Sequence, residues 1–153
     1  MNIFFLDKDP VKAAQLQCDK HVVKMVLETA QMVSTAVRNQ GHDVGYLSAY
    51  PKHPMTIWVN KSKNNFAWAL KHGLALGEEY THRYNKVHAS HKMLKTIQDL
   101  DIKGNAKDMT TPPLCMPDEY KKPSYIESYR NYYVNAKKHF AKYTNREIPE
   151  FMK

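Results

Sequence analysis

Residues 18–28 read Cys18-Asp19-Lys20-His21-Val22-Val23-Lys24-Met25-Val26-Leu27-Glu28. This stretch places two carboxylates, an imidazole and two ammonium groups within about three turns of helix. Residues three and four positions apart share a helix face, so His21, Lys24 and Glu28 lie along one edge. Aliphatic residues at the same spacing form the adjoining stripe: Val22, Val26, Ala30, Val33 and Val37. We expect this stripe to face the core, with the ionisable side chains at its border.

Helix signals flank this stretch on both sides. Asp9-Pro10 combines an N-cap residue with a first-turn proline, which predicts a short helix to about Gln17. The helix of the opening stretch is expected to begin with Asp19 as N-cap and to stop at Gln40-Gly41. Before these helices, residues 2–6 are apolar and predict a short buried strand or extended arm.

The second half of the chain is also mostly helical in pattern. His53-Pro54 starts a long helical region predicted over residues 54–97, with a break near residues 61–64 as an alternative. Residues 100–123 contain four prolines and predict a long connection or lid, and a last helix follows over residues 124–143. The whole chain, 1–153, is therefore predicted to be one compact all-α domain, a helical bundle with an extended N-terminal segment.

One stripe of the long helical region has an unusual composition. It contains Gly73 and Gly77, and each glycine costs about 1 kcal/mol in a helix interior unless a neighbour must approach closely. The stripe ends in phenols and imidazoles: Tyr80, Tyr84, His88 and His91. We expect these rings to hydrogen-bond across a helix interface or to line a base-binding pocket.

Composition limits the classes of protein that fit. Lys and Arg outnumber Asp and Glu by 23 to 15, giving a net charge of +8, which favours an anionic partner such as nucleic acid, although a soluble basic surface has the same composition. Cys18 and Cys115 lack the spacing of a zinc motif or a disulfide framework and are expected to be reduced. No apolar run has the length of a membrane span, so we expect a cytoplasmic protein.

The ionisable cluster is the first candidate for chemistry. Glu28 and His21, supported by Asp19 and Lys24, could supply an acid or base, or stabilise a cationic intermediate. A solvated helix edge is the alternative explanation. His88 and His91 are three residues apart, but a third metal ligand is missing, so we expect neither a metal nor a cofactor.

The last predicted helix carries the second candidate. Its aromatic residues alternate with Arg130, Lys137, Lys138 and Lys142, a combination that can stack on bases and contact phosphates. Core packing explains most of these rings equally well, so we expect only one or two to be available to a ligand. The chain contains no P-loop, GxGxxG, GxSxG or HExxH motif, which disfavours the enzyme classes that carry them.

Seven segments along the chain carry a family resemblance: Asn2-Ile3-Phe4-Phe5-Leu6-Asp7, Asp9-Pro10-Val11-Lys12-Ala13-Ala14, Cys18 to Met25, His53-Pro54, Glu79 to Tyr84, Pro117-Asp118 and Tyr129 to Tyr133. Together these segments resemble a family of small, mostly uncharacterised phage and bacterial proteins. More distantly, the layout is similar to the pyrimidine-dimer DNA glycosylases of the endonuclease V type, small basic helical enzymes.

The resemblance implies roles for particular residues. Glu28 would be the carboxylate that assists attack and stabilises the sugar cation, with His21 beside the DNA. The family's nucleophile is the amine of the residue after the initiator methionine, but Asn2 is large for methionine removal, so the free amine could instead belong to Met1. Leu27 precedes Glu28 and Gln31 follows a turn later, where that family has arginines.

Together, these observations predict a DNA N-glycosylase or lyase acting on damaged or modified pyrimidines, with DNA as its partner. Two alternatives remain open: an enzyme for free nucleotides or small phosphodiesters that uses His88 and His91, and a non-catalytic phage accessory protein that binds nucleic acid or a host protein. If the protein is phage-encoded, its compartment is the host cytoplasm. The candidate substrate-binding residues are Asp19, Lys20, Lys24, His53, Tyr80, Tyr84, His88, His91 and Arg130.

Overall fold

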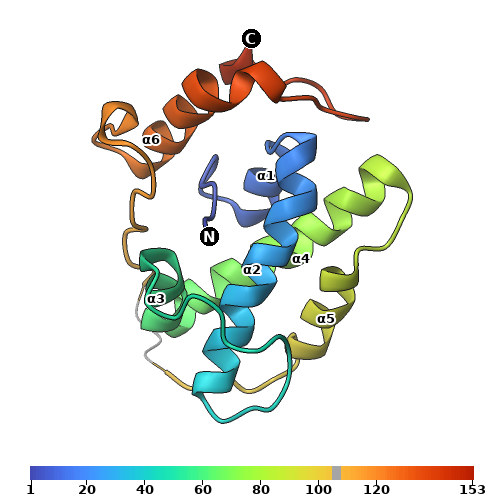
Figure 1. Cartoon of the computed structure of the whole chain (residues 1–153), viewed down its shortest axis with the longest axis vertical. Coiled ribbons are helices and arrows are strands. Elements are labelled where there is room, and N and C mark those ends of the chain that lie inside the picture. The colour runs from blue at the N-terminus through green and yellow to red at the C-terminus, as the bar shows by residue number, and fades with distance from the viewer. Residues whose placement is uncertain (105–107) are drawn as a thin grey trace.

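Helices dominate the computed structural model, which describes residues 1–104 and 108–153 (Figure 1). In these ranges no residue is in a β-strand, which confirms the predicted all-α class. The α-helices are α1 (Pro10–Gln15), α2 (Asp19–Asn39), α3 (Pro54–Lys61), α4 (Lys63–Tyr84), α5 (Ala89–Ile97) and α6 (Tyr125–Tyr132). Shorter elements are a π-helical turn, Tyr133–Lys137, and 3-10 turns at Asp118–Tyr120, Lys138–Phe140 and Glu150–Met152.

Helix α2 runs through the middle of the molecule and packs against α3, α4 and α5 (Figure 1). The predicted apolar stripe from Val22 to Val37 is fully buried. Within residues 19–37 of this helix, only four side chains are exposed: Lys20, Val23, Lys24 and Leu27. We call these four residues the α2 strip. Within residues 19–37, these are the exposed side chains that the central helix presents to a large partner.

The N-terminal segment forms a buried extended arm, one of the two predicted alternatives. Ile3, Phe5 and Leu6 are fully buried, and the Phe5 ring lies edge-on to Trp58 at 5.3 Å between centroids. Arg130 Nε donates a hydrogen bond to the Leu6 carbonyl at 2.7 Å. Side chains from α3 and α6 thereby hold the arm inside the molecule.

Both early helix starts were predicted within one or two residues. Asp9 caps α1 as expected, since its Oδ1 accepts a hydrogen bond from the Val11 amide at 2.8 Å, but α1 ends at Gln15 rather than Gln17. The N-cap of α2 is Cys18, so the prediction that Asp19 caps this helix is wrong. The Asp19 carboxylate is used elsewhere, because it pairs with Arg83 and accepts hydrogen bonds from Thr144.

The region predicted as one long helix, 54–97, is three helices. The break near residues 61–64 is confirmed: Ser62 ends α3 and caps α4, where its Oγ accepts from the Asn65 amide at 3.0 Å. A second break was not predicted. Asn85 adopts a left-handed conformation with φ of 55°, which ends α4, and the His88 side chain then caps α5.

The two glycines of α4 allow neighbouring helices to approach closely. A Cβ atom on Gly73 would lie 2.9 Å from Leu94 of α5 and 3.0 Å from Thr29 of α2. A Cβ atom on Gly77 would overlap the ring of His91 in α5. The expected close approach is therefore present at both positions.

The C-terminal third differs from the prediction of one helix over 124–143. Helix α6 ends at Tyr132, and the chain continues through the π-helical turn and a 3-10 turn. In its described residues, the proline-rich connection before it has no regular structure apart from one 3-10 turn, and Thr110 fixes it to the helices by hydrogen bonds with Trp58 and Asn65. Residues 105–107, within the predicted connection, lie outside the described residues.

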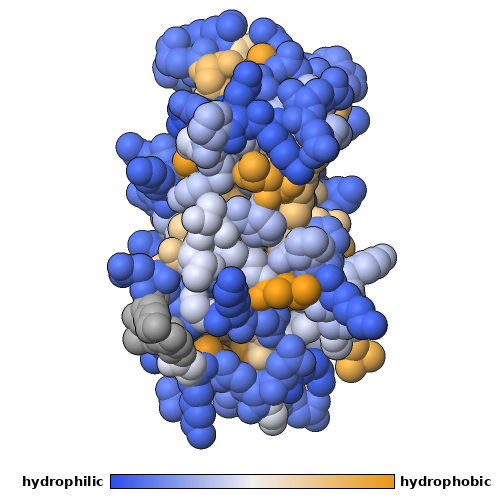
Figure 2. Space-filling view, turned by 90° about the vertical axis from the view of Figure 1, so that its left-hand side faces the viewer, coloured by the Kyte–Doolittle hydropathy of each residue, from blue (hydrophilic) through white to orange (hydrophobic). Residues whose placement is uncertain are grey.

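The surface is mixed in polarity. Figure 2 shows one long side of the molecule, hydrophilic towards both ends and more apolar across its middle. Exposed large hydrophobic side chains come from several elements, including Leu47, Val87 and Ile148. None of the described helices combines the length and hydropathy needed to cross a membrane.

We expect Gly77→Ala to lower the free energy of unfolding by about 1–3 kcal/mol, because the new methyl group forces α5 away from α4. In a His91→Gly background both the ring and the Cβ atom that the new methyl group would meet are absent, and the same substitution should raise stability by about 0.5–1 kcal/mol through helix propensity. Equilibrium unfolding in urea of the four proteins measures both effects. An equal loss in both backgrounds would contradict the close approach.

Candidate active site

The carboxylate of Glu28 lies at the end of the N-terminal arm. The α-amino nitrogen of Met1 is 3.0 Å from Glu28 Oε1, and the Asn2 amide donates to the same oxygen at 3.1 Å. Lys24 Nζ lies 3.9 Å from Oε2. The Glu28 side chain is only 11 % exposed. Three nitrogen donors thus surround one carboxylate at the boundary between core and solvent.

The arm runs antiparallel to α2, which explains how its first residues meet Glu28. Phe4 stacks on His21, with ring centroids 4.3 Å apart and planes 9° from parallel. Two residues earlier, Asn2 is at Glu28, about two helical turns along α2 from His21. The Asn2 side chain donates to the Cys115 carbonyl at 3.0 Å and accepts from the Ile3 amide at 2.8 Å. These bonds fix the backbone that carries the amine.

His53 lies in the electrostatic neighbourhood of the amine and Glu28. Its Nδ1 caps α3 by accepting from the Met55 amide at 3.1 Å. Burial lowers the pKa of the His53 imidazole, the charge of the N-terminal amine lowers it further, and the Glu28 carboxylate raises it. His53 is therefore coupled to both charges, although it is distant in sequence from each.

Cys115 is a neighbour of the amine that the sequence did not indicate. Burial raises the pKa of its thiol, and the positive N-terminus opposes that rise. The Cys115 amide donates to the Tyr129 hydroxyl at 3.2 Å, which ties the connection to α6. The position of Cys115 depends on how residues 108–117 run across the molecule. A single cysteine in the sequence does not indicate that path.

His21 is held as a neutral imidazole beside the α2 strip. Burial and the charges of Lys137 and Lys24 lower its pKa to about 3. Its Nδ1 lies 2.6 Å from the Tyr133 hydroxyl. His21 and Glu28 share Lys24 as a neighbour, since Lys24 acts on the pKa of one and pairs with the other. The two candidate catalytic residues of α2 therefore border the same exposed lysine.

Three other predicted binding residues have structural partners. Asp19 is paired with Arg83, which also binds Glu79 in a buried ion-pair network. Lys20 is exposed, with its Nζ 4.9 Å from the centroid of the Phe140 ring. Arg130 binds the Leu6 carbonyl and stacks over Phe151. Of these, only Lys20 is free to meet a large partner from the α2 strip.

The predicted tyrosine and histidine group lies along the other edge of the α2 strip. Tyr80 and Tyr84 pack at 5.2 Å between centroids, and together with Val23 and Lys86 they line an open cavity of about 210 Å³. His88 Nε2 faces the Val23 carbonyl at 3.2 Å. Helix α2 therefore separates this aromatic edge from the edge that carries Glu28 and the amine.

His91 is not part of that aromatic edge. It is buried beneath α4 next to Gly77, and neither ring nitrogen has a hydrogen-bond partner among the described residues. His88 uses its Nδ1 to cap α5 by accepting from the Ser90 amide at 3.0 Å. Within residues 1–104 and 108–153, no three His, Cys, Asp or Glu side chains gather as a metal-binding group.

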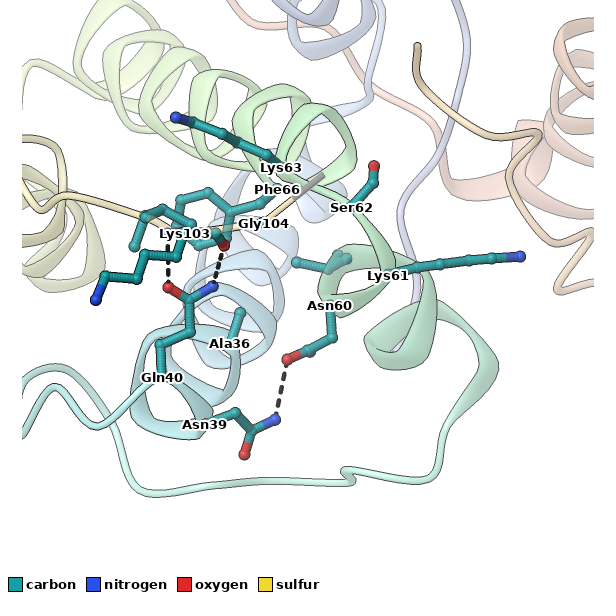
Figure 3. Close-up of a pocket in the computed structure, with 12 residues that line it drawn as sticks. Ala36, Asn39, Gln40, Asn60, Lys61, Ser62, Lys63, Phe66, Lys103 and Gly104 are labelled. Carbon is teal, nitrogen blue, oxygen red and sulfur yellow. Dashed lines mark hydrogen bonds between the residues drawn. The ribbon is translucent and has the colours of Figure 1, made fainter. Parts of the chain in front are cut away.

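A separate cavity of about 140 Å³ lies where α2 ends, at the junction of α3 and α4 (Figure 3). Gln40 is held there by two hydrogen bonds with Lys103, and Asn39 donates to Asn60 at 2.9 Å. Its described lining residues include lysines but no carboxylate or imidazole. It offers no acid–base pair, and its lining residues on α2, Ala36 and Asn39, follow Glu28 by about two to three helical turns.

The family sequence model described as pyrimidine dimer DNA glycosylase matches residues 1–93, more than half of the chain. The chain belongs to this family. The matched range contains Met1, His21, Glu28 and His53, and it ends before Cys115 and α6. Searches of curated proteins and of solved structures found no significant match.

We expect Glu28→Gln to lower the pKa of His53, because the carboxylate that favours the imidazolium is lost while the N-terminal charge remains. Titration of the histidine resonances by NMR measures this change. The pKa of His72 is lowered to about 4 by burial, with no charged group among its causes, so His72 is the internal control and should not shift. An unchanged His53 titration would contradict the coupling.

Proposed function

We propose that this protein is a DNA N-glycosylase for pyrimidine lesions in which the N-terminal amine attacks the sugar. The observation that carries the proposal is the contact of 3.0 Å between the Met1 amine and Glu28, on a chain that belongs to the pyrimidine dimer DNA glycosylase family. An amine beside a carboxylate is the arrangement that nucleophilic displacement at a sugar C1′ requires, because the carboxylate can accept a proton from the ammonium group.

The chemistry can be written with these two groups. The neutral amine attacks C1′, the bond from C1′ to the base nitrogen breaks, and the base leaves with the bonding electrons and takes up a proton. After the amine has lost one proton, the C1′–O4′ bond breaks and O4′ takes up a proton, which leaves a protonated imine between the amine nitrogen and C1′. The imine is hydrolysed by water, or it loses the 3′ phosphate by β-elimination after a proton is removed from C2′. Glu28, as a carboxylate, takes the proton of the attacking amine and stabilises the positive charge that develops on the sugar.

The position of the arm keeps this proposal independent of methionine removal. The nitrogens of Met1 and Asn2 both contact Glu28 Oε1, at 3.0 and 3.1 Å. If Met1 is retained, its amine is the nucleophile. If Met1 is removed, the freed Asn2 amine lies at the same carboxylate. Asn2 is held in place by its side-chain bond to Cys115 in either case.

The exposed groups around α2 suit a DNA ligand. Lys20 and Lys24 on the α2 strip can meet phosphates, and Val23 and Leu27 on the same strip offer apolar contact to an opened base stack. The open cavity beside Tyr80 and Tyr84 can receive an unstacked base, since aromatic faces stack on any base. These features support a duplex lying across the strip, with the reacting sugar at the amine.

The two alternative functions have weaker support from the geometry. An enzyme for free nucleotides would use His88 and His91 together, but His88 is occupied as a helix cap and His91 is buried under α4. A non-catalytic DNA-binding protein would need neither an amine nor a carboxylate at the end of a buried arm. The experiments below distinguish such a non-catalytic DNA-binding protein from a glycosylase.

The amine mechanism predicts a covalent complex. Incubation with a duplex that contains an abasic site, in the presence of borohydride, should trap the protein on the DNA through its N-terminal residue, because the imine is reduced to a stable amine. Mass spectrometry of the trapped peptide identifies whether Met1 or Asn2 carries the sugar. A protein with an acetylated N-terminus is the control and should not be trapped. Trapping on an internal lysine alone would overturn the assignment of the nucleophile.

Glu28→Gln should reduce base release from irradiated duplex DNA by at least about 100-fold, because the amide can neither accept the proton nor stabilise the sugar cation. Gel assays of base release and strand cleavage measure the loss. Glu127→Gln, on the exposed side of α6, is the matched control and should retain full activity. If acetylation abolishes trapping but leaves base release intact, Glu28-activated water replaces the amine as nucleophile. Full activity of Glu28→Gln would exclude both mechanisms.

A further inference from the structure

The π-helical turn Tyr133–Lys137 contacts α2 at His21, although it lies outside the range matched by the family. The Tyr133 side chain is fully buried. Its hydroxyl accepts from the Cys18 amide at 3.0 Å and lies 2.6 Å from His21 Nδ1 and 3.4 Å from Cys18 Sγ. An extra residue in a helical turn changes which side chains face inward, and such turns are frequent at functional sites.

The hydrogen bonds around the Tyr133 oxygen determine where its proton lies. The Cys18 amide uses one lone pair of this oxygen, and burial raises the pKa of the phenol well above its usual range, so the hydroxyl remains protonated. The proton can go to the imidazole nitrogen or to the sulfur. Thiol sulfur is a weak acceptor, and the contact with His21 Nδ1 is much shorter. Tyr133 therefore donates to Nδ1, and the proton of the neutral ring is on Nε2.

Lysine side chains lie around the imidazole. Lys24 follows His21 by about one turn of α2, and Lys137 Nζ lies 4.7 Å from the centroid of the Tyr132 ring, which neighbours the Phe4 ring that stacks on His21. His21 Nε2 makes no hydrogen bond within the described residues, and it is not among the fully buried atoms that lack a partner. Lys24 and Lys137 are close enough to act on the His21 pKa. Lys20 reaches the same place from α2, since it lies over the ring of Phe140, which packs edge-on to His21 at 5.7 Å.

We propose that His21 Nε2–H, Lys24 and Lys137 form a binding site for one phosphodiester group of DNA, and that Tyr133 is the positioning residue that keeps the Nε2 proton available. The π-helical turn serves both purposes, since it directs Tyr133 inward and carries Lys137 at its end. This inference rests on the proposed function, because it places the phosphate about two turns of α2 from Glu28.

The chemistry of the cluster favours a phosphodiester over other ligands. Lysine ammonium groups supply charge without fixed direction, whereas one N–H of a clamped imidazole supplies direction. Anionic oxygen accepts from both. The stacking of Phe4 on His21 and the bond to Tyr133 fix the plane of the ring, so the N–H vector is set before DNA arrives. The site thus aligns one backbone phosphate relative to the amine at Glu28.

The tautomer of His21 is tested directly by ¹⁵N NMR of the full-length protein at neutral pH. We expect the spectrum to show a protonated Nε2 and an unprotonated Nδ1, with the Nε2–H resonance shifting when a duplex containing a tetrahydrofuran abasic analogue is added. A proton on Nδ1, or an Nε2–H resonance unaffected by saturating duplex, would overturn the proposal. Neither measurement depends on glycosylase activity.

Affinity for the same duplex, measured over a range of salt concentrations, tests the partners of the phosphate. Lys137→Gln should reduce the magnitude of the salt-dependence slope by about one counterion, whereas Lys71→Gln on the exposed side of α4 should leave it unchanged. Tyr133→Phe should weaken binding about three- to tenfold with the slope unchanged. Tyr143→Phe removes a hydroxyl bonded to the Leu16 carbonyl at 2.9 Å and is the matched control, with affinity retained.

A third pair of variants keeps the test decisive if Tyr133→Phe fails to fold. The amide of His21→Gln can still donate where Nε2–H stood, and it should bind at least threefold more tightly than His21→Leu. Equal affinities for these two variants would overturn the proposal. If these binding results hold while base release is absent, the phosphate site stands and the glycosylase assignment fails. If base release occurs but the phosphate variants do not change the affinity for DNA, the glycosylase assignment stands and the phosphate site fails.

Discussion

The contact between Glu28 and the nitrogens of the first two residues is the constraint on which the rest of the structure depends. A buried carboxylate is costly unless donors surround it, and here those donors come from the chain terminus rather than from another helix. The terminus can remain there only because Ile3 to Leu6 are buried in the core behind it. Burial of the apolar arm therefore determines the position of the N-terminal amine.

The core-facing stripe of α2 and the all-α class could be predicted because both follow from helical periodicity. The end of α4 at Asn85 and the π-helical turn after Tyr132 could not, since a left-handed residue or one extra residue per turn interrupts a helix without changing its hydrophobic pattern. The glycines of α4, in contrast, allowed a correct prediction. Glycine lowers the stability of a helix interior, so its presence indicates that a neighbour must approach closely, and His91 and Leu94 are among those neighbours.

The candidate site was only partly predictable, for a different physical reason. Residues on one helix, such as His21, Lys24 and Glu28, have a spacing that fixes their relative positions. Cys115 lies beside the first residues through contacts between segments far apart in the chain, which no local pattern encodes. His53 was a candidate from the His53-Pro54 segment of the family resemblance, but its electrostatic coupling to the amine and Glu28 arises only in the folded chain. Asp19 was predicted from the same dense cluster to bind substrate, but in the fold its carboxylate forms an ion pair with the buried Arg83.

The bonds that hold the N-terminal arm have a consequence for the order of events during synthesis. Met1 to Leu6 are synthesised before the residues that hold them, since Asn2 is bonded to Cys115 and Leu6 to Arg130. Until residue 130 has emerged, these two attachments are missing and the amine is not held at Glu28 by the full set of contacts. The N-terminal arm therefore acquires its full set of contacts only after residue 130 has been synthesised.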